Sequence, residues 1–495
     1  MIEQAEIDRL REESLPPRGH LIGGAQVRAR SGQTMDAVSP IDGSVLTTVA
    51  RGSPEDMDAA IASARSAFED GHWKTMPPAQ RKRIMHRWAD LIETHAPELA
   101  VLGVRDNGTE IAMAFNAEPM SASATIRYYA EAIDKIYGEI APTKPDILGL
   151  IHREPVGVVG AIIPWNFPLM IGAWKIGPAL AVGNSVVVKP PETASLSLIR
   201  LVELAHEAGL PEGVLNVVTG EGATVGKALA LSMDVDVLAF TGSGATGRKL
   251  LEYSARSNLK RVYLELGGKS PHIVFADTAD LDKAAQAVAS GVFRNAGQVC
   301  VAGSRLLIDE TIRDDFVGAV AARAAGLQPG DPLKLDTKIG AINSEAQLTQ
   351  DLQAVETARE EGGEVVLGGV RSLEETGGFY MGPTIVDRVQ PEHSLFQKEV
   401  FGPVLSVTPF AGEDEAVRLA NATDYGLAAG VWTSDVARAH RMIRAIDAGV
   451  VHVNTYGGPD VTVPLGGVGQ SGNGSDKSLH AIDKYINLKT AWVQI

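Results

Sequence analysis

The feature that most constrains the fold is a regular alternation of short apolar β segments with helical segments. In the middle of the chain, extended apolar runs occupy residues 156–163, 185–188, 214–218, 235–240 and 262–266. Further along, a second series occupies residues 304–308, 384–386, 405–407 and 430–432. Alternation of this kind indicates parallel β-sheets that are covered by helices. The sequence therefore predicts an α/β fold with two lobes and a ligand site between them.

The segments before this region have a different pattern. Short β-like runs fill the first 50 residues, and a helix is predicted to begin at Ser53, with Pro54 in its first turn. Apolar residues recur at helical spacing over residues 78–136, and residues 137–153 return to extended segments around a proline-containing turn. This return predicts a β-hairpin.

Length and charge limit the classes of function. A chain of 495 residues exceeds what one hydrophobic core usually fills. It carries 61 acidic against 45 basic side chains and should repel phosphate backbones, so we expect no nucleic-acid partner. The apolar stretch 169–188 has the length of a membrane span, but Lys175, Pro178 and Asn184 interrupt it. We expect a helix, a turn and a strand there, and no membrane association.

Cys300 is the only cysteine, so no internal disulfide can form, and a reducing compartment, the cytoplasm, is expected. Residues 1–6 are acidic and lack the apolar core of a secretory signal. Together with the upstream Glu265, the sulfur forms a nucleophile-and-base pattern that suits a covalent thioester mechanism. A buried core cysteine is nevertheless the commoner role, and Cys300 taken alone favours it.

Asn166 lies where an apolar strand ends and a helix opens, within the motif at residues 164–168. A side-chain amide held there can donate a hydrogen bond to a developing oxyanion, an interaction of about 3 to 4 kcal/mol in comparable sites. The alternative is that an asparagine simply suits a turn.

Two strand ends suggest a nucleotide site. Lys189 and Glu192 follow one apolar strand, and a carboxylate there can accept the hydroxyls of an adenosine ribose. After another strand, Gly242, Ser243 and Gly247 belong to a G-x-G-x-x-G match that opens a helix and can accommodate a pyrophosphate. The alternatives are a solvated strand end and tight packing of helix on strand.

A third pattern lies in the second lobe. Glu399 could hold a second ribose, and Phe401 could pack against a nicotinamide. An ordinary corner between a helix and a strand would explain these residues equally well. We identify no metal-ligating set of residues in the sequence.

Six motifs occur in the order that aldehyde dehydrogenases show. They are residues 164–168, Lys189 with Glu192, 240–243, 265–269, 297–300 and 399–403. The chain therefore resembles this family over nearly its whole length, and Cys300 is interpreted as a nucleophile. The resemblance implies an aldehyde dehydrogenase-like α/β fold with two Rossmann-like lobes, one cofactor-binding and one catalytic, plus a small β oligomerisation arm.

The resemblance also implies a domain order. The segments are a first part of the cofactor-binding domain at 1–136, an oligomerisation hairpin at 137–154, the Rossmann-like part at 155–267, a catalytic domain at 268–470, and a C-terminal return with an oligomerisation strand at 471–495. An exposed strand edge needs cover from another chain, so we expect a homodimer or a homotetramer.

The implied reaction is NAD⁺-dependent oxidation of an aldehyde to its carboxylic acid. The Cys300 thiolate attacks the aldehyde carbon, and the Asn166 amide and the Cys300 backbone N–H hold the oxyanion. Glu265 activates the water that hydrolyses the thioester. Lys175 and Asp476 match a proton relay from this base. Because a carboxylate near the ribose repels a 2′-phosphate, Glu192 favours NAD⁺ over NADP⁺.

The remaining implied contacts concern the cofactor and the aldehyde. Cofactor contacts are expected from Ile163, Trp165, Lys189, Glu192, Gly242, Ser243, Gly247, Leu266, Glu399 and Phe401. Substrate contacts are expected from Phe167, Trp174, Val299, Val301 and Leu465, and from Glu118 and Asp460 at the mouth of the tunnel. Either carboxylate could attract an ammonium or guanidinium group, although a solvated acidic surface would explain both.

Within the family, residues 130–135, 471–474 and 476–481 look most like bacterial enzymes of polyamine breakdown. Those enzymes oxidise γ-glutamyl-γ-aminobutyraldehyde, guanidinobutyraldehyde and related ω-amino aldehydes. The chain departs from the usual family residues at Thr109, Gly244, Leu465, Gly469 and Ser475. Since Leu465 replaces a phenylalanine, it could widen the tunnel.

Three other functions stay open at this point. The substrate could be a neutral aliphatic or aromatic aldehyde. A coenzyme A-acylating semialdehyde dehydrogenase is a rival that Glu265 argues against, because such relatives generally lack this glutamate. A catalytically silent structural or binding relative is the third alternative.

Overall fold

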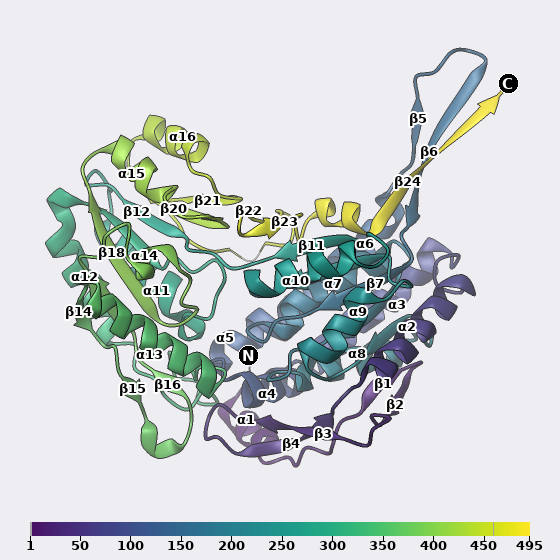
Figure 1. Ribbon diagram of the computed structural model, residues 1–495, viewed down its shortest axis with the longest axis horizontal. Coiled ribbons are helices and arrows are strands. Elements are labelled where there is room, and N and C mark those ends of the chain that lie inside the picture. Colours follow the sequence, from purple (N-terminus) through teal and green to yellow (C-terminus); the bar gives the residue numbers. More distant parts are fainter. Residues whose placement is uncertain (1, 459) are drawn as a thin grey trace.

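The computed structural model describes residues 2–458 and 460–495. Two α/β lobes lie beside each other in Figure 1, and a narrow β arm that ends at the C-terminus projects from one of them. The predicted α/β class with two lobes is confirmed.

The first lobe is built on an eight-stranded sheet with the order β2-β1-β9-β8-β7-β10-β11-β23. The five strands from β9 to β11 are parallel, and the outer pairings are antiparallel. The strands are β1 (His20–Ile22), β2 (Ala25–Val27), β7 (Val158–Ile162), β8 (Ser185–Lys189), β9 (Leu215–Val217), β10 (Val237–Thr241), β11 (Arg261–Glu265) and β23 (Gly472–Asn473).

Helices cover both faces of this sheet, because alternate residues of its strands enter different cores. In β8, Val186 and Val188 join a core with α3, α6, α7 and α8, whereas Val187 joins the opposite core with α2, α9 and α10. The helices of this lobe are α1 (Gln4–Arg11), α2 (Pro54–Glu69), α3 (Pro78–Thr94), α4 (Ala96–Asn107), α5 (Ile111–Phe115), α6 (Ser121–Ala132), α7 (Pro168–Ala181), α8 (Leu196–Glu207), α9 (Lys227–Leu231) and α10 (Gly244–Ala255).

The second lobe is built on a seven-stranded sheet with the order β14-β17-β18-β13-β12-β20-β21. Only the pairing of β14 with β17 is antiparallel among the described strands of this sheet. The strands are β12 (Pro271–Val274), β13 (Arg305–Asp309), β14 (Glu364–Leu367), β17 (Thr384–Asp387), β18 (Val404–Phe410), β20 (Ala428–Trp432) and β21 (Val450–Val453). Its helices are α11 (Leu281–Phe293), α12 (Arg313–Ala325), α13 (Glu345–Glu360), α14 (Ser394–Gln397), α15 (Glu413–Ala420) and α16 (Val436–Ala445).

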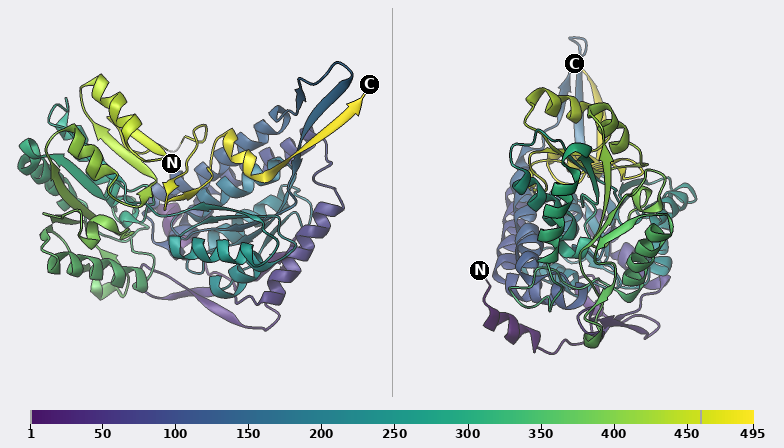
Figure 2. Two further views of the ribbon diagram at one scale, coloured as in Figure 1. Left: turned by 45° about the horizontal axis from the view of Figure 1, so that its top comes forward. Right: turned by 90° about the vertical axis from the view of Figure 1, so that its left-hand side faces the viewer.

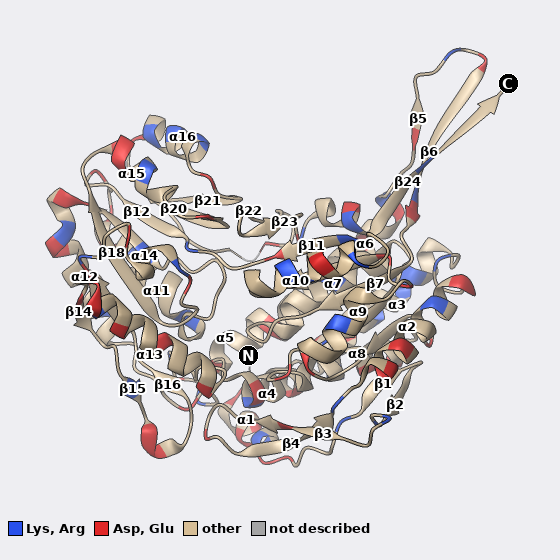
Figure 3. Cartoon of the chain, viewed as in Figure 1, with Lys and Arg blue, Asp and Glu red and all other residues tan. Residues whose placement is uncertain are grey.

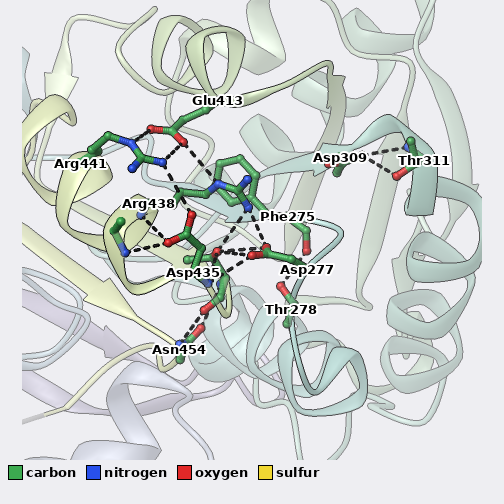
Figure 4. A network of polar contacts seen from close by, with 12 residues as sticks. Phe275, Asp277, Thr278, Asp309, Thr311, Glu413, Asp435, Arg438, Arg441 and Asn454 are labelled. Carbon is green, nitrogen blue, oxygen red and sulfur yellow. Dashed lines mark hydrogen bonds and ion pairs between the residues drawn. The ribbon is translucent and has the colours of Figure 1, made fainter.

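A polar network fastens α15 and α16 to the carboxyl end of β12 (Figure 4). The Arg438 guanidinium lies over the Phe275 ring, 4.4 Å from its centroid, and pairs with Asp277 at 2.8 Å. Glu413 accepts hydrogen bonds from Arg441 at 2.6 and 2.7 Å. This network holds the outer helices of the second lobe in place.

The arm is a three-stranded antiparallel sheet with the order β24-β6-β5. Its strands are β5 (Glu139–Ala141), β6 (Ile147–Pro155) and β24 (Ile486–Gln494). Figure 2 shows the arm standing away from the body in both further views. Its exposed apolar side chains include Ile140, Leu488 and Trp492. The predicted hairpin is present, and the last strand of the chain completes its sheet.

The remaining strands form three short two-stranded sheets. They are β3 (Thr34–Val38) with β4 (Val45–Ala50), β15 (Arg371–Ser372) with β16 (Tyr380–Met381), and β19 (Tyr425–Gly426) with β22 (Val468–Gly469).

Local sequence signals explain several element ends. Ser53 caps α2: its side chain accepts from the Asp56 backbone N–H at 3.3 Å, and the Asp56 carboxylate accepts from the Ser53 N–H at 2.9 Å. The helical region expected over 78–136 is interrupted at Gly108, whose φ of 83° ends α4, and at a π-helical turn, η1 (Asn116–Met120). The apolar stretch 169–188 forms most of α7 and β8, as predicted.

Acidic and basic side chains are interspersed along the helices of both lobes in the view of Figure 3. Among the described helices, none has the length and apolar character needed to cross a membrane. The domain boundaries and the absence of a nucleic-acid partner stay predictions.

Candidate active site

The order of strands reverses between β7 and β10 in the first sheet. From β7 the chain adds β8 and β9 on one side, and then returns to add β10 and β11 on the other. In open α/β sheets a ligand crevice forms at such a reversal, outside the carboxyl ends of the strands. The segment with Asn166 follows β7 and the segment with Gly242 follows β10, so both predicted motifs lie at this crevice.

Lys189 and Glu192 lie at the carboxyl end of β8, next to the crevice. The Lys189 ammonium is 2.9 Å from the Glu192 carboxylate, which also accepts from the Gly222 N–H at 2.6 Å. Burial opposes ionisation of Glu192, but Lys189 and this hydrogen bond lower its pKa. An ionised carboxylate that keeps 42% of its side-chain surface exposed can accept further hydrogen bonds from a ligand.

Two separate interactions explain the residues of the glycine-rich turn after β10. The Ser243 side chain caps α10 by accepting from the Thr246 N–H at 3.3 Å. Gly247 packs against β11, because a Cβ there would lie 3.0 Å from the Leu266 side chain. The Thr241 hydroxyl oxygen is buried without a hydrogen-bond partner among the described residues. The turn therefore combines close packing with an unpaired polar group at the crevice, which fits a polar ligand.

Aromatic rings from the two lobes meet beside this turn. The Trp165 and Phe401 rings contact edge to face, with centroids 5.3 Å apart. Phe401 has a φ of 66°, a left-handed conformation that a bulky residue rarely adopts and that is often found at functional sites. Next to it, one carboxylate oxygen of Glu399 accepts from the Gly268 N–H at 2.9 Å, and burial raises the pKa of Glu399 to about 7.

The turn that carries Cys300 is unusually constrained. Asn295, Ala296 and Gly297 have φ values of 50°, 50° and 75°, three left-handed residues in a row. A Cβ on Gly297 would overlap the Gly402 carbonyl oxygen, so only glycine fits there. This conformation leaves Cys300 half-buried at the wall of a pocket.

Asn166 lies in a buried hydrogen-bond network beneath Cys300. Its side-chain amide donates to the Gln298 carbonyl oxygen at 2.9 Å, and Asn295 donates to the same oxygen at 3.3 Å. Thr109 in turn donates to the Asn295 side-chain oxygen at 2.8 Å. The network fixes the orientation of the Asn166 amide and leaves its second N–H available. Thr109, one of the departures from the usual family residues, belongs to this supporting network.

Glu265 ends β11, and one of its carboxylate oxygens is buried without a partner among the described residues. Lys175 and Lys484 both pair with Asp476, the former at 2.9 Å, and all three side chains are almost fully buried. Burial and the charge of Asp476 raise the pKa of Glu265 well above its usual range, while the two ammonium groups oppose this. The predicted grouping of Glu265, Lys175 and Asp476 is present, and Lys484 is an additional member.

The thiol of Cys300 is protonated at neutral pH. Burial, together with the nearby Glu399 and Glu265 carboxylates, raises its pKa to about 12. The thiol must therefore lose its proton before it can act as a nucleophile. Because Glu265 is an electrostatic neighbour with a raised pKa, it is a suitable proton acceptor.

A pocket of about 760 Å³ opens at Cys300 between the lobes. Five of the predicted substrate residues line it, namely Phe167, Trp174, Val299, Val301 and Leu465. Methionine side chains from α5, η1 and α7 widen the apolar wall, including Met113, Met120 and Met170. The volume suits an elongated substrate with an apolar middle.

The two predicted acidic residues do not line this pocket. Glu118 is 4% exposed and its carboxylate accepts from the Met170 N–H at 2.7 Å, so it caps the first turn of α7. Burial raises the pKa of Glu118 well above its usual range. The prediction that Glu118 attracts a cation at the mouth is therefore wrong. Asp460 is exposed, and its carboxylate accepts from the Thr462 N–H at 2.8 Å.

The charged side chains that do line the pocket are cations, Arg294 and Lys477. Neither was selected from the sequence, although each is adjacent in the chain to a segment that was: Arg294 precedes the Cys300 turn and Lys477 follows Asp476. The remaining departures lie outside the pocket lining. Gly244 begins α10, and Gly469 pairs with Tyr425.

The fold and the site together define an enzyme of the dinucleotide-binding α/β class. Residues 27–491 match the aldehyde dehydrogenase family, and the chain belongs to this family. It is 49% identical over 474 residues to NADP/NAD-dependent aldehyde dehydrogenase PuuC of Escherichia coli, covering 96% of this chain and 95% of that protein.

Two solved structures are similar over 100% of both chains. The first is γ-glutamyl-γ-aminobutyraldehyde dehydrogenase of Burkholderia cenocepacia, with 48% identity and a TM-score of 0.97. The second is the indole-3-acetaldehyde dehydrogenase AldA of P. syringae, a mutant solved with NAD⁺ and IAA, with 48% identity and a TM-score of 0.98.

Proposed function

We propose that the protein oxidises an aldehyde to its carboxylic acid with NAD⁺, through a thioester on Cys300. The observation that carries this proposal is the convergence of Cys300 with a substrate-sized pocket, a buried carboxylate and an oriented amide. Family membership and the relatives solved with NAD⁺ support it.

The residues proposed for the cofactor fit a dinucleotide. Glu192 would accept the adenosine ribose hydroxyls beside Lys189, and Ser243 with the start of α10 would face the pyrophosphate. Ile163, Trp165, Gly242, Gly247 and Leu266 would form the crevice walls. Glu399 and Phe401 would hold the nicotinamide end. NAD⁺ supplies a hydride acceptor when it is bound there.

Cys300 begins the reaction by giving its proton to Glu265. The thiolate then attacks the aldehyde carbon, and the negative charge passes to the aldehyde oxygen. Asn166, held by the Gln298 carbonyl, and the Cys300 backbone N–H would stabilise this oxyanion. Loss of a hydride from the same carbon leaves a thioester on Cys300.

Glu265 acts again when water hydrolyses the thioester. A raised pKa makes its carboxylate a better base than an ordinary glutamate, and the ammonium groups of Lys175 and Lys484 keep ionisation possible. Water attacks the acyl carbon, the carboxylic acid leaves, and the Cys300 thiolate is released. Asp476 pairs with both lysines and would pass the proton away from Glu265.

For the substrate we propose an aldehyde of polyamine breakdown, most specifically a γ-glutamyl-γ-aminobutyraldehyde. The relative from Burkholderia cenocepacia that bears this name and the long pocket support the assignment. Neutral aromatic aldehydes are the second candidate, since Phe167, Trp174 and Leu465 form an apolar wall and the P. syringae relative is named for indole-3-acetaldehyde.

We further propose a homodimer or homotetramer assembled through the arm. The exposed Ile140, Leu488 and Trp492 and the free sheet edges support this proposal, because such edges are usually covered. Light scattering of the protein and of a truncation that ends at Tyr485 tests it, and a monomeric full chain at micromolar concentration would contradict it. The single, catalytic cysteine supports a reducing compartment, the cytoplasm.

The experiment for the whole proposal is NADH formation from NAD⁺ with a panel of aldehydes. The panel sets γ-glutamyl-γ-aminobutyraldehyde and γ-aminobutyraldehyde against pentanal and indole-3-acetaldehyde, with Cys300→Ser as the blank. A preference of at least about tenfold in kcat/KM for the γ-glutamyl compound supports the substrate assignment. Failure of the folded protein to oxidise any of these aldehydes would contradict the activity itself.

A further inference from the structure

Two cations, Arg294 and Lys477, line the pocket. Arg294 comes from the turn after α11, and Lys477 comes from the C-terminal segment, so they approach from different parts of the chain. The Lys477 ammonium lies 5.6 Å from the centre of the Trp174 ring, another lining residue. Burial lowers the pKa of His452, which also lines the pocket, and the charges of Arg294 and Lys477 lower it further. The two charges therefore act on one region.

Neither cation is paired within the described part of the chain. Within residues 2–458 and 460–495, no hydrogen bond or ion pair within 4.0 Å involves the Arg294 guanidinium or the Lys477 ammonium, and the Arg294 Nε is buried without a partner. The buried ammonium groups of Lys175 and Lys484, by contrast, both pair with the Asp476 carboxylate. Arg294 is half-buried, and a buried N–H donor such as its Nε costs free energy unless a ligand supplies an acceptor.

Three carboxylates that were predicted as site residues make other contacts. Asp476 is occupied by Lys175 and Lys484, and Glu118 is turned toward the first turn of α7. Asp460 is an exposed carboxylate that acts on Lys477, but the pair forms no ion pair within 4.0 Å, and Asp460 accepts a hydrogen bond from the Thr462 N–H. Among the residues that line the pocket there is no aspartate or glutamate.

We propose that Arg294 and Lys477 form a carboxylate-binding subsite that selects aldehydes carrying a distal carboxylate group and disfavours those carrying only an ammonium group. This inference rests on the proposed function and deepens it. A guanidinium offers a planar pair of N–H donors that matches a carboxylate, and an ammonium adds a second charge-assisted hydrogen bond.

The subsite distinguishes the two kinds of polyamine-derived aldehyde. A γ-glutamyl group brings an α-carboxylate together with its α-ammonium group, so this end of the substrate has no net charge and offers an acceptor to the two cations. A free ω-amino aldehyde brings only a cation to a region that already holds two. Glutamylation would therefore convert a repelled substrate into a bound one. The Met113, Met170 and Trp174 side chains would surround the apolar middle of such a substrate.

The test compares three aldehydes of similar length: glutarate semialdehyde, pentanal and trimethylaminobutyraldehyde. For the wild-type enzyme we expect kcat/KM for glutarate semialdehyde to exceed that for the cationic aldehyde by at least about tenfold. Arg294→Gln and Lys477→Gln should each lower the ratio of kcat/KM for glutarate semialdehyde to that for pentanal at least about fivefold, because pentanal has no carboxylate to lose a partner. Arg294→Lys should retain part of the preference because it keeps the charge.

A second readout does not depend on turnover. The affinity of the NAD⁺-loaded Cys300→Ala protein for glutarate can be measured by calorimetry. Adding Arg294→Gln or Lys477→Gln to this protein should weaken the affinity at least about fivefold. Lys338→Gln is the matched control, because Lys338 is an exposed cation outside the pocket lining. Equal kcat/KM for all three aldehydes, together with unchanged glutarate binding in both variants, would overturn the subsite. Oxidation of pentanal alone would leave the proposed activity standing, whereas no oxidation at all would contradict it.

Discussion

Replacing Asn166 with alanine should affect catalysis far more than folding. The Asn166 amide nitrogen carries two hydrogens, and one of them donates to the Gln298 carbonyl oxygen at 2.9 Å. The other is available to an oxyanion on the substrate. Removal of one such donor typically slows the chemical step by about a hundredfold to a thousandfold, or about 2.7 to 4 kcal/mol.

The effect of Asn166→Ala on stability should be much smaller. The Gln298 carbonyl also accepts from Asn295 at 3.3 Å, so it keeps a partner, and the net loss is about 1 kcal/mol for a single hydrogen bond. Stopped-flow measurement of the first NADH turnover at saturating aldehyde reports the chemical step, and urea unfolding reports stability. A decrease of less than about tenfold in the single-turnover rate, with the protein folded, would refute the assignment of Asn166 to the oxyanion.

Three further outcomes follow from the charges of the site. Glu265→Gln should yield at most about one equivalent of NADH per subunit and accumulate the acyl enzyme, detectable by mass spectrometry; sustained turnover would contradict its role as the base. Glu192→Gln should raise the ratio of kcat/KM for NADP⁺ to that for NAD⁺ by about tenfold, since it removes a negative charge beside the ribose, and an unchanged ratio would contradict that placement. Alkylation of free enzyme by iodoacetamide at Cys300 should rise about tenfold per pH unit from pH 7 to 9, because the thiol pKa is raised to about 12; a plateau in this range would contradict the raised pKa.

The sequence predicted those strands whose apolar runs are continuous. β7, β8 and β10 are buried on both faces, so nearly every residue in them is apolar and the pattern is unambiguous. β12 was missed, although it lies in the interior of the second sheet, because it is four residues long and begins with a proline. Its identity as a strand depends on its neighbours β13 and β20.

The site residues that belong to local sequence motifs could be predicted. Those whose position depends on tertiary contacts could not. Cys300, Glu265 and Asn166 occur in fixed local motifs, and the structure brings all three to the crevice between the lobes. Glu118 was assigned to the wrong environment, because nothing in its local sequence shows that the N-terminus of α7 will lie against it. Arg294 and Lys477 share a pocket only because two distant segments meet there.

The C-terminal segment connects these features physically. Gly472 in β23 pairs with Glu265 in β11, and its φ of 121° and the closeness of the Leu264 carbonyl exclude any larger residue. Four residues later, Asp476 pairs with the two buried lysines, and the next residue, Lys477, lines the pocket. The same segment then enters β24 of the arm. One stretch of backbone thus positions the base, its electrostatic partners and a cation of the substrate pocket, so a shift in its register would alter hydrolysis and substrate selection together. That coupling gives a physical reason for the C-terminal segment to return to the first sheet before it reaches the arm.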